Sequence, residues 1–279
     1  MEPLIEISRN KWSQLQALYR NDWPWGIEGF RLLDIHIQYP DMNQAFNFKV
    51  YCPGGDLHNG MVAISDMEHY YQVYVYPVTR NITNIEHALT NTNIINWNRT
   101  ICIPSVNSET LVCLKIICQR LSLQLSEEVV CKHLLKKESK PFEILNHPLN
   151  TYVAPLKPEY LDLIDRTWTY YTPNNSRRFF EILMRNGLSY VLYSTDNHKP
   201  LAWIFIGEAG AFTHLYCVAT QRGKGYAEYI TKIATNDLLR QGKDVLAYTL
   251  KENVRPQNLF RKLGFDFLDN VIYVDIQRI

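Results

Sequence analysis

The sequence predicts an α/β (α+β) fold made of two domains in tandem, and three observations lead to this prediction. Strictly alternating stretches such as residues 46–52 have the period of half-buried strands, whereas longer stretches such as 108–121 have the period of helices. A polar, proline-marked segment at residues 136–150 separates two halves of ordinary domain size. We therefore expect an N-terminal domain at residues 1–145 and a second domain at residues 146–279.

The elements of the first half follow from the spacing of its apolar residues, since alternation predicts strands and a spacing of three or four predicts helices. In chain order they are a helix at 8–20, strands at 33–39, 46–52, 61–64 and 71–76, a helix at 82–89, a strand at 101–103 and a helix at 108–121. Residues 121–125 return to a period of two, while residues 129–135 fit a strand or a helix.

The second half has a clearer order of elements. It begins with two predicted helices, continues with strands, and ends with strand–helix–strand–helix–strand. The helices are at 158–170, 176–186, 227–239 and 253–263, and the strands are at 190–194, 201–207, 212–219, 244–249 and 271–277. No clear sequence repeat links the halves, although the first has a loosely similar order of elements.

The composition is that of a globular protein and argues against several classes of function. Of the 279 residues 46% are hydrophobic, and the net charge of +1 gives no reason to expect nucleic acid as a partner. No stretch approaches the length of a membrane span, so we expect no membrane partner. Six irregularly spaced cysteines favour free thiols over disulfides or zinc, and no metal is expected. Because the N-terminus is acidic and lacks an apolar run, no targeting peptide is predicted, and we expect a cytoplasmic protein.

The segment at residues 213–239 combines a buried strand, a basic turn with two glycines and an amphipathic helix. The first turn of a helix leaves N–H groups without partners at the positive end of the helix dipole, which favours a phosphate. Gly223 and Gly225 let a diphosphate approach the main chain, and Arg222 and Lys224 add positive charge. The alternatives are an ordinary tight turn before a basic helix and another nucleotide loop, but the patterns of the two familiar nucleotide loops are incomplete here.

Residues 222–227, Arg-Gly-Lys-Gly-Tyr-Ala, resemble the R-x-x-G-x-A pyrophosphate signature of the GNAT superfamily of N-acyltransferases, which use acyl-coenzyme A. Residues 253–265, which end in Leu-Gly-Phe, resemble the last helix of that superfamily and its exit. The resemblance implies a GNAT-type mixed, mostly antiparallel sheet flanked by helices. The first half contains no counterpart of the glycine-rich turn, since no glycine lies between Gly60 and Gly187, so we expect it to be a degenerate copy.

Several short segments are similar to the glycine N-acyltransferase family, and their order covers nearly the whole chain. They are residues 71–74, 94–97, Trp168, 175–179 and 200–203. The likeness implies transfer of an acyl group from acyl-CoA to the amine of a glycine-like amino acid or another small amine. Plain core packing is the alternative explanation of Trp97, Trp168 and Trp203. The family is mitochondrial, which is the alternative to a cytoplasmic location.

The resemblance also implies the residues that hold coenzyme A. The diphosphate would lie on the turn and helix start, and the pantetheine arm would add like a strand beside the signature strand. Backbone N–H groups of Cys217 and Val218 would stabilise the oxyanion of the tetrahedral intermediate, while the Cys217 side chain is interpreted as a small core residue in preference to a nucleophile. The expected coenzyme-binding residues are Tyr216, Cys217, Val218, Arg222, Gly223, Lys224, Gly225, Tyr226, Ala227, Asn253 and Phe260.

The general base and acid are not found at the family's positions. Spacing from Arg222 puts Ala211 where a glutamate base is expected, which leaves Glu208 and His214 as candidates. His214 has a suitable ordinary pKa, about 6.5, but a structural histidine is an equal alternative, and Glu208 is alternatively a solvent-facing turn residue. Phe260 occupies the position of the general acid, which is a tyrosine in many superfamily members. Tyr226 and Tyr248 are substitutes for this acid in name only, since nothing but their proximity in sequence recommends them.

Three functions therefore compete. The first is an acyl-CoA:amine N-acyltransferase with a small-molecule acceptor. The second is a catalytically impaired coenzyme-A-binding protein that serves as a sensor or scaffold, and the third is a protein N-acetyltransferase. Turnover with small amines distinguishes the first function from the second. An acidic groove for a peptide would favour the third, but the sequence contains no acidic run near the signature that predicts one. The sequence does not indicate an oligomeric state.

Overall fold

The computed structural model describes residues 1–68, 70–144, 147–170 and 176–278. The chain forms two compact units, one of Met1–Val130 with Asn270–Ile279 and the other of Cys131–Asp269. Each unit is built from a sheet with helices packed on it. The predicted α/β fold with a mostly antiparallel sheet is confirmed, and the units repeat the same order of elements.

The first unit has its strands in the order β1-β2-β3-β4-β5-β12. All neighbours are antiparallel except β4 and β5, which are parallel with Gln72 opposite Cys102. Apolar residues of α4 and α5 pack with one face of this sheet to form the core of the unit. The elements are β1 (Leu4–Glu6), α1 (Trp12–Leu18), α2 (Ile27–Gln38), α3 (Pro40–Ala45), β2 (Lys49–Pro53), β3 (Met61–Met67), β4 (Tyr70–Tyr76), α4 (Thr83–Asn91), β5 (Ile101–Val106), α5 (Ser108–Leu121), the start of β6 (Leu123–Leu135) and most of β12 (Asp266–Arg278).

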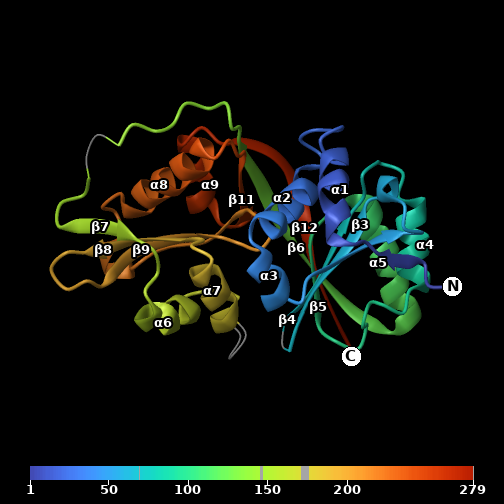
Figure 1. Ribbon diagram of the computed structural model, residues 1–279. Coiled ribbons are helices and arrows are strands. Elements are labelled where there is room, and N and C mark those ends of the chain that lie inside the picture. The colour runs from blue at the N-terminus through green and yellow to red at the C-terminus, as the bar shows by residue number, and fades with distance from the viewer. Residues whose placement is uncertain (69, 145–146, 171–175, 279) are drawn as a thin grey trace. The chain divides into compact units, whose positions relative to one another are not determined.

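The second unit has its strands in the order β6-β11-β10-β9-β8-β7, with β10 and β11 parallel. Helices α8 and α9 lie on one face of the sheet, and α6 and α7 lie on the other (Figure 1). The elements are β7 (Thr151–Ala154), α6 (Leu161–Arg166), α7 (Ser176–Arg185), β8 (Ser189–Ser194), β9 (Pro200–Ile206), β10 (Phe212–Cys217), α8 (Tyr226–Arg240), β11 (Val245–Leu250) and α9 (Val254–Lys262).

The last strand of each repeat closes the sheet of the other unit. In the first unit β12 pairs with β5, with Ile276 opposite Ile101, and in the second unit β6 lies next to β11. The predicted boundary between residues 145 and 146 falls on residues outside the described part of the chain, and it stays a prediction. The chain passes from one compact unit to the other after Val130 and again before Asn270. These boundaries lie within β6 and β12, so each of these strands contributes residues to both units.

The segment predicted to be a linker runs along α8 inside the second unit. The side-chain amide of Asn236 accepts from the Phe142 N–H at 2.7 Å and donates to the Phe142 carbonyl at 2.8 Å. Asp244 accepts from the Lys137 N–H at 2.9 Å. His147 is bonded to the Tyr229 hydroxyl at 2.5 Å. The segment is thus attached to α8, whose N-terminus is described below, and to Asp244 just before β11.

Most predicted elements are confirmed, and one is wrong. The segment 33–39, predicted as an alternating strand, instead forms the end of helix α2 up to Gln38. Helix α2 buries residues over most of its surface, including Glu28, Arg31 and His36, so its apolar positions do not show a single helical stripe. Residues 129–135, which fitted a strand or a helix, belong to strand β6.

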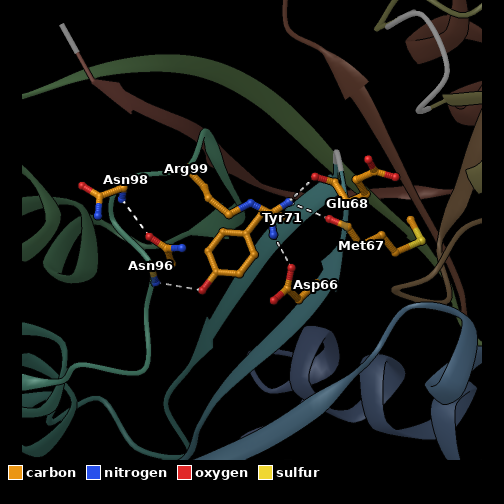
Figure 2. A network of polar contacts seen from close by, with 7 residues as sticks. All are labelled: Asp66, Met67, Glu68, Tyr71, Asn96, Asn98 and Arg99. Carbon is orange, nitrogen blue, oxygen red and sulfur yellow. Dashed lines mark hydrogen bonds and ion pairs between the residues drawn. The ribbon is translucent and has the colours of Figure 1, made fainter.

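Two segments that resemble the glycine N-acyltransferase family contact each other in the first unit. The Asn96 N–H donates to the hydroxyl of Tyr71 at 3.0 Å, and Arg99 lies over the Tyr71 ring at 4.6 Å. Figure 2 shows Arg99 also paired with Asp66 and donating to the carbonyl of Met67, a bond of 2.6 Å. These hydrogen bonds and the ion pair connect the end of the β3–β4 hairpin to the segment before β5. Asn175, part of another such segment, lies outside the described residues.

Candidate functional site

The turn between β10 and α8 contains the basic hexapeptide at residues 222–227. Gly223 and Gly225 have φ angles of 82° and 77°, in the left-handed region that side chains disfavour. A Cβ atom built at either glycine would meet no heavy atom within 4 Å. The backbone conformation therefore favours glycine at both positions, and the turn borders open space in which a ligand can approach the main chain.

Helix α8 begins after Gly225, and no side chain caps its N-terminus. Its first N–H groups have no partner within the helix and lie at the positive end of the helix dipole. Glu228 stands in this turn, but its carboxylate is paired with Lys232 at 2.8 Å and with Lys262 at 2.6 Å. Hydrogen bonds from these lysines hold the pKa of Glu228 below its ordinary value. The helix start therefore remains electropositive, which favours a phosphate.

Arg222 and Lys224 add two positive charges at the same turn. The Nε atom of Arg222 donates to the carbonyl oxygen of Cys217 at 3.2 Å, and its guanidinium lies 5.6 Å from the centre of the Tyr216 ring. The Lys224 ammonium donates to the side-chain oxygen of Gln221 at 2.9 Å. Within the described part of the chain neither side chain has a carboxylate partner. Both charges are therefore available to an anion.

Strand β10 separates from β11 after its first residue. The parallel register joins Phe212 to Ala247 and, among the described residues of these two strands, goes no further, while β10 continues to pair with β9 to its end. A bulge between Thr213 and Tyr216 interrupts the pairing with β9, and His214 within it has a φ of 48°. The edge of β10 on the β11 side is therefore open to an extended ligand.

The two predicted oxyanion donors differ in their hydrogen bonds. The Val218 N–H donates to the Leu201 carbonyl of β9 at 2.9 Å, so the prediction that Val218 stabilises an oxyanion is wrong. Because backbone groups alternate in direction along a strand, those of Cys217 point away from β9. The bond from Arg222 to the Cys217 carbonyl agrees with this direction. Of the two predicted donors, only Cys217 has an N–H on the open side of β10.

The thiol of Cys217 is protonated and half-buried. Burial raises its pKa above the ordinary value, while the positive charges of Arg222 and Lys224 act in the opposite direction. Its sulfur lies 3.8 Å from the carbonyl oxygen of Val218. A raised thiol pKa works against nucleophilic attack, which agrees with the interpretation of this side chain as a small packing residue.

His214 is held in one tautomer by the C-terminal end of α6. Its Nε2 atom donates to the Ile164 carbonyl of α6 at 2.9 Å and lies 3.4 Å from the Thr167 hydroxyl. Nδ1 therefore carries the lone pair of the neutral ring, and it has no hydrogen-bond partner among the described residues. Burial lowers the pKa of His214 to about 4, although the bond to Ile164 raises it. The ring is neutral at physiological pH.

Glu208, the other candidate base, does not face solvent as the alternative reading of it had proposed. It lies in the turn between β9 and β10, is only 2% exposed, and already interacts with neighbouring groups. The turn is closed by a bond from the Gly207 N–H to the Ala211 carbonyl at 2.8 Å. Ala211, at the position where a glutamate was expected, is buried at 6% exposure. Of the two candidates, His214 presents the accessible lone pair.

Helix α9 contains or borders two further residues that were predicted to bind coenzyme A. Asn253 stands at its N-cap position without a side-chain bond to the helix. Phe260 is buried and packs against Phe265, with ring centres 5.0 Å apart, and against His133 at 5.6 Å. No sequence pattern indicates a function for His133. Strand β6 places it beside β11, where its Nε2 lies 2.9 Å from the Thr249 hydroxyl. The predicted contacts of Asn253, Phe260 and Tyr226 with a coenzyme stay predictions.

The described part of the chain contains neither a metal-binding cluster nor a membrane-spanning helix. No group of three or more histidine, cysteine, aspartate or glutamate residues is arranged to hold a metal ion there. Among the same residues, no helix has the length and apolar character needed to cross a membrane.

The chain is similar to a known family in the part that contains the β10–α8 turn, and to solved structures over its whole length. The model of a family described as "FR47-like protein" matches residues 189–274, the part from β8 to β12 that contains the β10–α8 turn. A Drosophila protein solved by a structural genomics consortium is 14% identical, with a TM-score of 0.85 and 99% of each chain covered.

Two further solved structures share the fold over nearly the full length. A tandem GNAT protein from the clavulanic acid biosynthesis pathway is 14% identical, with a TM-score of 0.57 and 97% of each chain covered. A GCN5-related N-acetyltransferase from Sphaerobacter thermophilus is 12% identical, with a TM-score of 0.56, and the match covers 100% of this chain and 97% of that one. The chain therefore has the tandem GNAT fold.

Proposed function

We propose that the protein is an acyl-CoA-dependent N-acyltransferase that transfers an acyl group to the amine of a glycine-like amino acid or another small amine. One observation carries the proposal. The N-terminus of α8 is uncapped, electropositive and preceded by two left-handed glycines that border open space. A diphosphate fits this arrangement, and acyl-CoA is the diphosphate-containing co-substrate that suits a GNAT fold.

The remainder of the coenzyme would follow β10. With the diphosphate on residues 223–228, the pantetheine arm would lie along the edge that β11 leaves open and form main-chain hydrogen bonds there. Tyr216 and Cys217 belong to this edge, and Asn253 stands at the start of the next helix. The Cys217 N–H would then donate to the thioester oxygen as it becomes an oxyanion.

His214 is the proposed base. The amine attacks the thioester carbon, and its nitrogen becomes positively charged in the tetrahedral intermediate. Nδ1 of the neutral His214 ring takes a proton from that nitrogen, and the C–S bond breaks to release the thiolate of coenzyme A. A base with a pKa near 4 is too weak to deprotonate a free ammonium ion, so the protein would select the neutral amine from solution.

The leaving group requires little help, because a thiolate has a conjugate acid pKa of about 8.5. A phenylalanine at position 260 is compatible with this step, since protonation of the thiolate can follow its release. The glycine N-acyltransferase likeness supports a small-molecule acceptor, with no role for nucleic acid or membrane. We place the protein in the cytoplasm, with mitochondria as the alternative from that likeness.

A catalytically impaired coenzyme-A-binding protein is the second candidate, and two positions favour it. Ala211 stands where a glutamate was expected, and Phe260 is buried against other aromatic rings where a tyrosine was expected. Such a protein would bind coenzyme A through the diphosphate site but would lack the side chains that transfer protons in catalysis.

The deciding experiment measures thiol release from acetyl-, benzoyl- and longer acyl-CoAs in the presence of amino acids and amines. Gly225→Glu serves as the blank, because its carboxylate would occupy the diphosphate position. Release that depends on the acceptor and exceeds the blank supports the transferase. Folded protein that binds coenzyme A, yet releases no thiol with any acceptor, supports the impaired binding protein.

A further inference from the structure

The base proposed above lies in a cluster of aromatic side chains, which we call the aromatic cluster. Strands β9 and β10, helix α7 and the turn that follows α6 contribute to it. The rings around His214, with the distances between ring centres, are Phe180 at 5.0 Å, Trp203 at 5.9 Å, Phe205 at 6.1 Å, Tyr216 at 6.1 Å and Trp168 at 6.3 Å.

The cluster has a buried floor and an accessible rim. Phe180, Trp203 and Phe205 are fully buried. Trp168 and Tyr216 are half-buried, and Tyr170, whose ring centre is 5.8 Å from that of Trp168, is 48% exposed. A molecule that reaches Nδ1 of His214 from solvent therefore meets aromatic rings on its way.

Among the described residues, no positively charged side chain is bonded to His214 or contributes to its lowered pKa. Its polar neighbours are the Ile164 carbonyl and the Thr167 hydroxyl, and burial together with the bond to that carbonyl accounts for the altered pKa of the ring. Asp165 of α6 is an acid, buried and bonded to the Ser176 hydroxyl. The Arg222 guanidinium lies near the Tyr216 ring, at the rim of the cluster. Its Nε atom donates to the Cys217 carbonyl beside the turn at residues 222–227.

The floor of the aromatic cluster also contains a polar group without a partner. The indole N–H of Trp203 is buried and has no hydrogen-bond acceptor among the described residues. Trp203 is stacked on Tyr216, with ring centres 4.8 Å apart, and its ring centre lies 5.9 Å from that of His214. A single neutral N–H enclosed in the floor does not supply the cation or the several donors that a carboxylate requires.

These surroundings discriminate between two kinds of acceptor. A free amino acid brings a carboxylate, which is unfavourable in an apolar site without a cation or several N–H donors. An amine on an aromatic or other apolar body brings no such charge, and its ring can stack against Trp168 or Tyr216. We infer that the acceptor is an amine with an aromatic or apolar body and no carboxylate, bound against the aromatic cluster. This inference rests on the proposed transferase function and narrows its acceptor class.

The test compares amines with amino acids that differ from them only by the carboxylate. Thiol release from acetyl-CoA is measured with phenethylamine against phenylalanine, tryptamine against tryptophan, and methylamine against glycine. We expect kcat/KM to be about tenfold or more higher for each aromatic amine than for its amino acid. Equal or faster turnover of the amino acids would overturn the inference and leave the transferase function standing. Absence of turnover with every acceptor would overturn both.

Variants at the rim test where the acceptor binds. Trp168→Ala should raise KM for phenethylamine about tenfold and leave KM for acetyl-CoA and for methylamine within about twofold, whereas Trp168→Phe should keep most of the affinity. Tyr170→Ala, at an exposed position that folding tolerates, should raise KM for phenethylamine about threefold. Unchanged KM for phenethylamine in both alanine variants would overturn the placement on the aromatic cluster.

Discussion

The two units contain the same strand–turn–helix segment, and only one of them is open to a ligand. In the first unit β4 leads into α4, and in the second β10 leads into α8. Each strand runs parallel to the next, β5 or β11, with Gln72 opposite Cys102 and Phe212 opposite Ala247. The backbone frame of this segment is therefore present twice.

The turn of the first unit is closed by the chain itself. Residues 77–82 contain no glycine, and the Asn81 side chain accepts from the Thr83 N–H at the start of α4 at 3.1 Å. Arg80 is paired with Asp22 at 3.3 Å. A Cβ atom at Gly60 would lie 2.4 Å from the Tyr76 carbonyl, so another segment packs directly on the end of β4.

This difference shows that the fold does not by itself make an anion site. In the first unit a side chain bonds an N–H at the helix start, and the arginine has a carboxylate partner. In the second unit no side chain caps the helix start, and Arg222 has no carboxylate partner among the described residues. The two units therefore differ at this turn by a few side chains, with the sheet and helices retained.

The largest expected effect comes from closing the open turn. Gly225→Glu should weaken coenzyme A binding by about a hundredfold or more, because a carboxylate would occupy the diphosphate position. Gly242→Glu is the matched control, since Gly242 also has a positive φ, 70°, and open space but lies beyond the other end of α8. Titration calorimetry measures both. Equal binding by the two variants would contradict the placement of the site.

A second prediction separates catalysis from binding within the open unit. His214→Ala should lower kcat about a hundredfold, the range expected for loss of a general base, and leave the Kd for acetyl-CoA unchanged. His198→Ala, in the exposed turn between β8 and β9, is the control and should retain the parent activity. Steady-state kinetics and calorimetry test the split. Parent-like kcat in His214→Ala would return His214 to a structural role.

A third prediction follows from the lowered pKa of His214. The pKa is about 4 in the fold, against about 6.5 for an unfolded chain, so on acidification the unfolded chain binds the proton first. The stability from this group is complete above pH 6.5 and is lost as the pH falls toward 4. The free energy of unfolding should fall by about 2–3 kcal/mol between pH 7 and pH 4.5 because of this group.

Urea unfolding at the two pH values measures that loss. His214→Gln cannot titrate, so its unfolding free energy should fall less than that of the parent by the same amount. An identical fall in both proteins would show that His214 has no lowered pKa.

The smallest expected effect compares the two arginines of the turns. Arg222→Ala should weaken coenzyme A binding about fivefold, since it removes one charge at an exposed phosphate position. Arg80→Ala should leave binding unchanged, because Arg80 is paired with Asp22 in the closed turn. Calorimetry at low and at high salt measures both, and the Arg222 effect should shrink at high salt. Similar losses in both variants would place a coenzyme contact in the first unit.

The sequence predicted the backbone of the β10–α8 turn well because its signal is local, while the coenzyme contacts of the turn stay predictions. The glycines, the basic residues and the helix start lie within six consecutive positions, and the structure places them in one turn. Helix α2 was misread because burial over most of its surface removes the stripe that distinguishes a helix from a strand.

The surroundings of His214 depend on contacts between distant residues. Its hydrogen bond to Ile164 spans 50 positions in the sequence, and the bulge that gives it a positive φ has no pattern in its residue types. The Val218 prediction failed for a related reason, because the direction of its N–H depends on the register of β10 with β9. The exchange of β6 and β12 between the units likewise leaves no local signal.

Hydrogen–deuterium exchange of the parent protein, with and without coenzyme A, tests the central claim most directly. The account predicts that coenzyme A slows exchange of the backbone N–H groups at residues 223–228 and along β10, and leaves residues 79–84 of the closed turn unchanged. Slower exchange at residues 79–84, or no change at residues 223–228 under saturating coenzyme A, would contradict it.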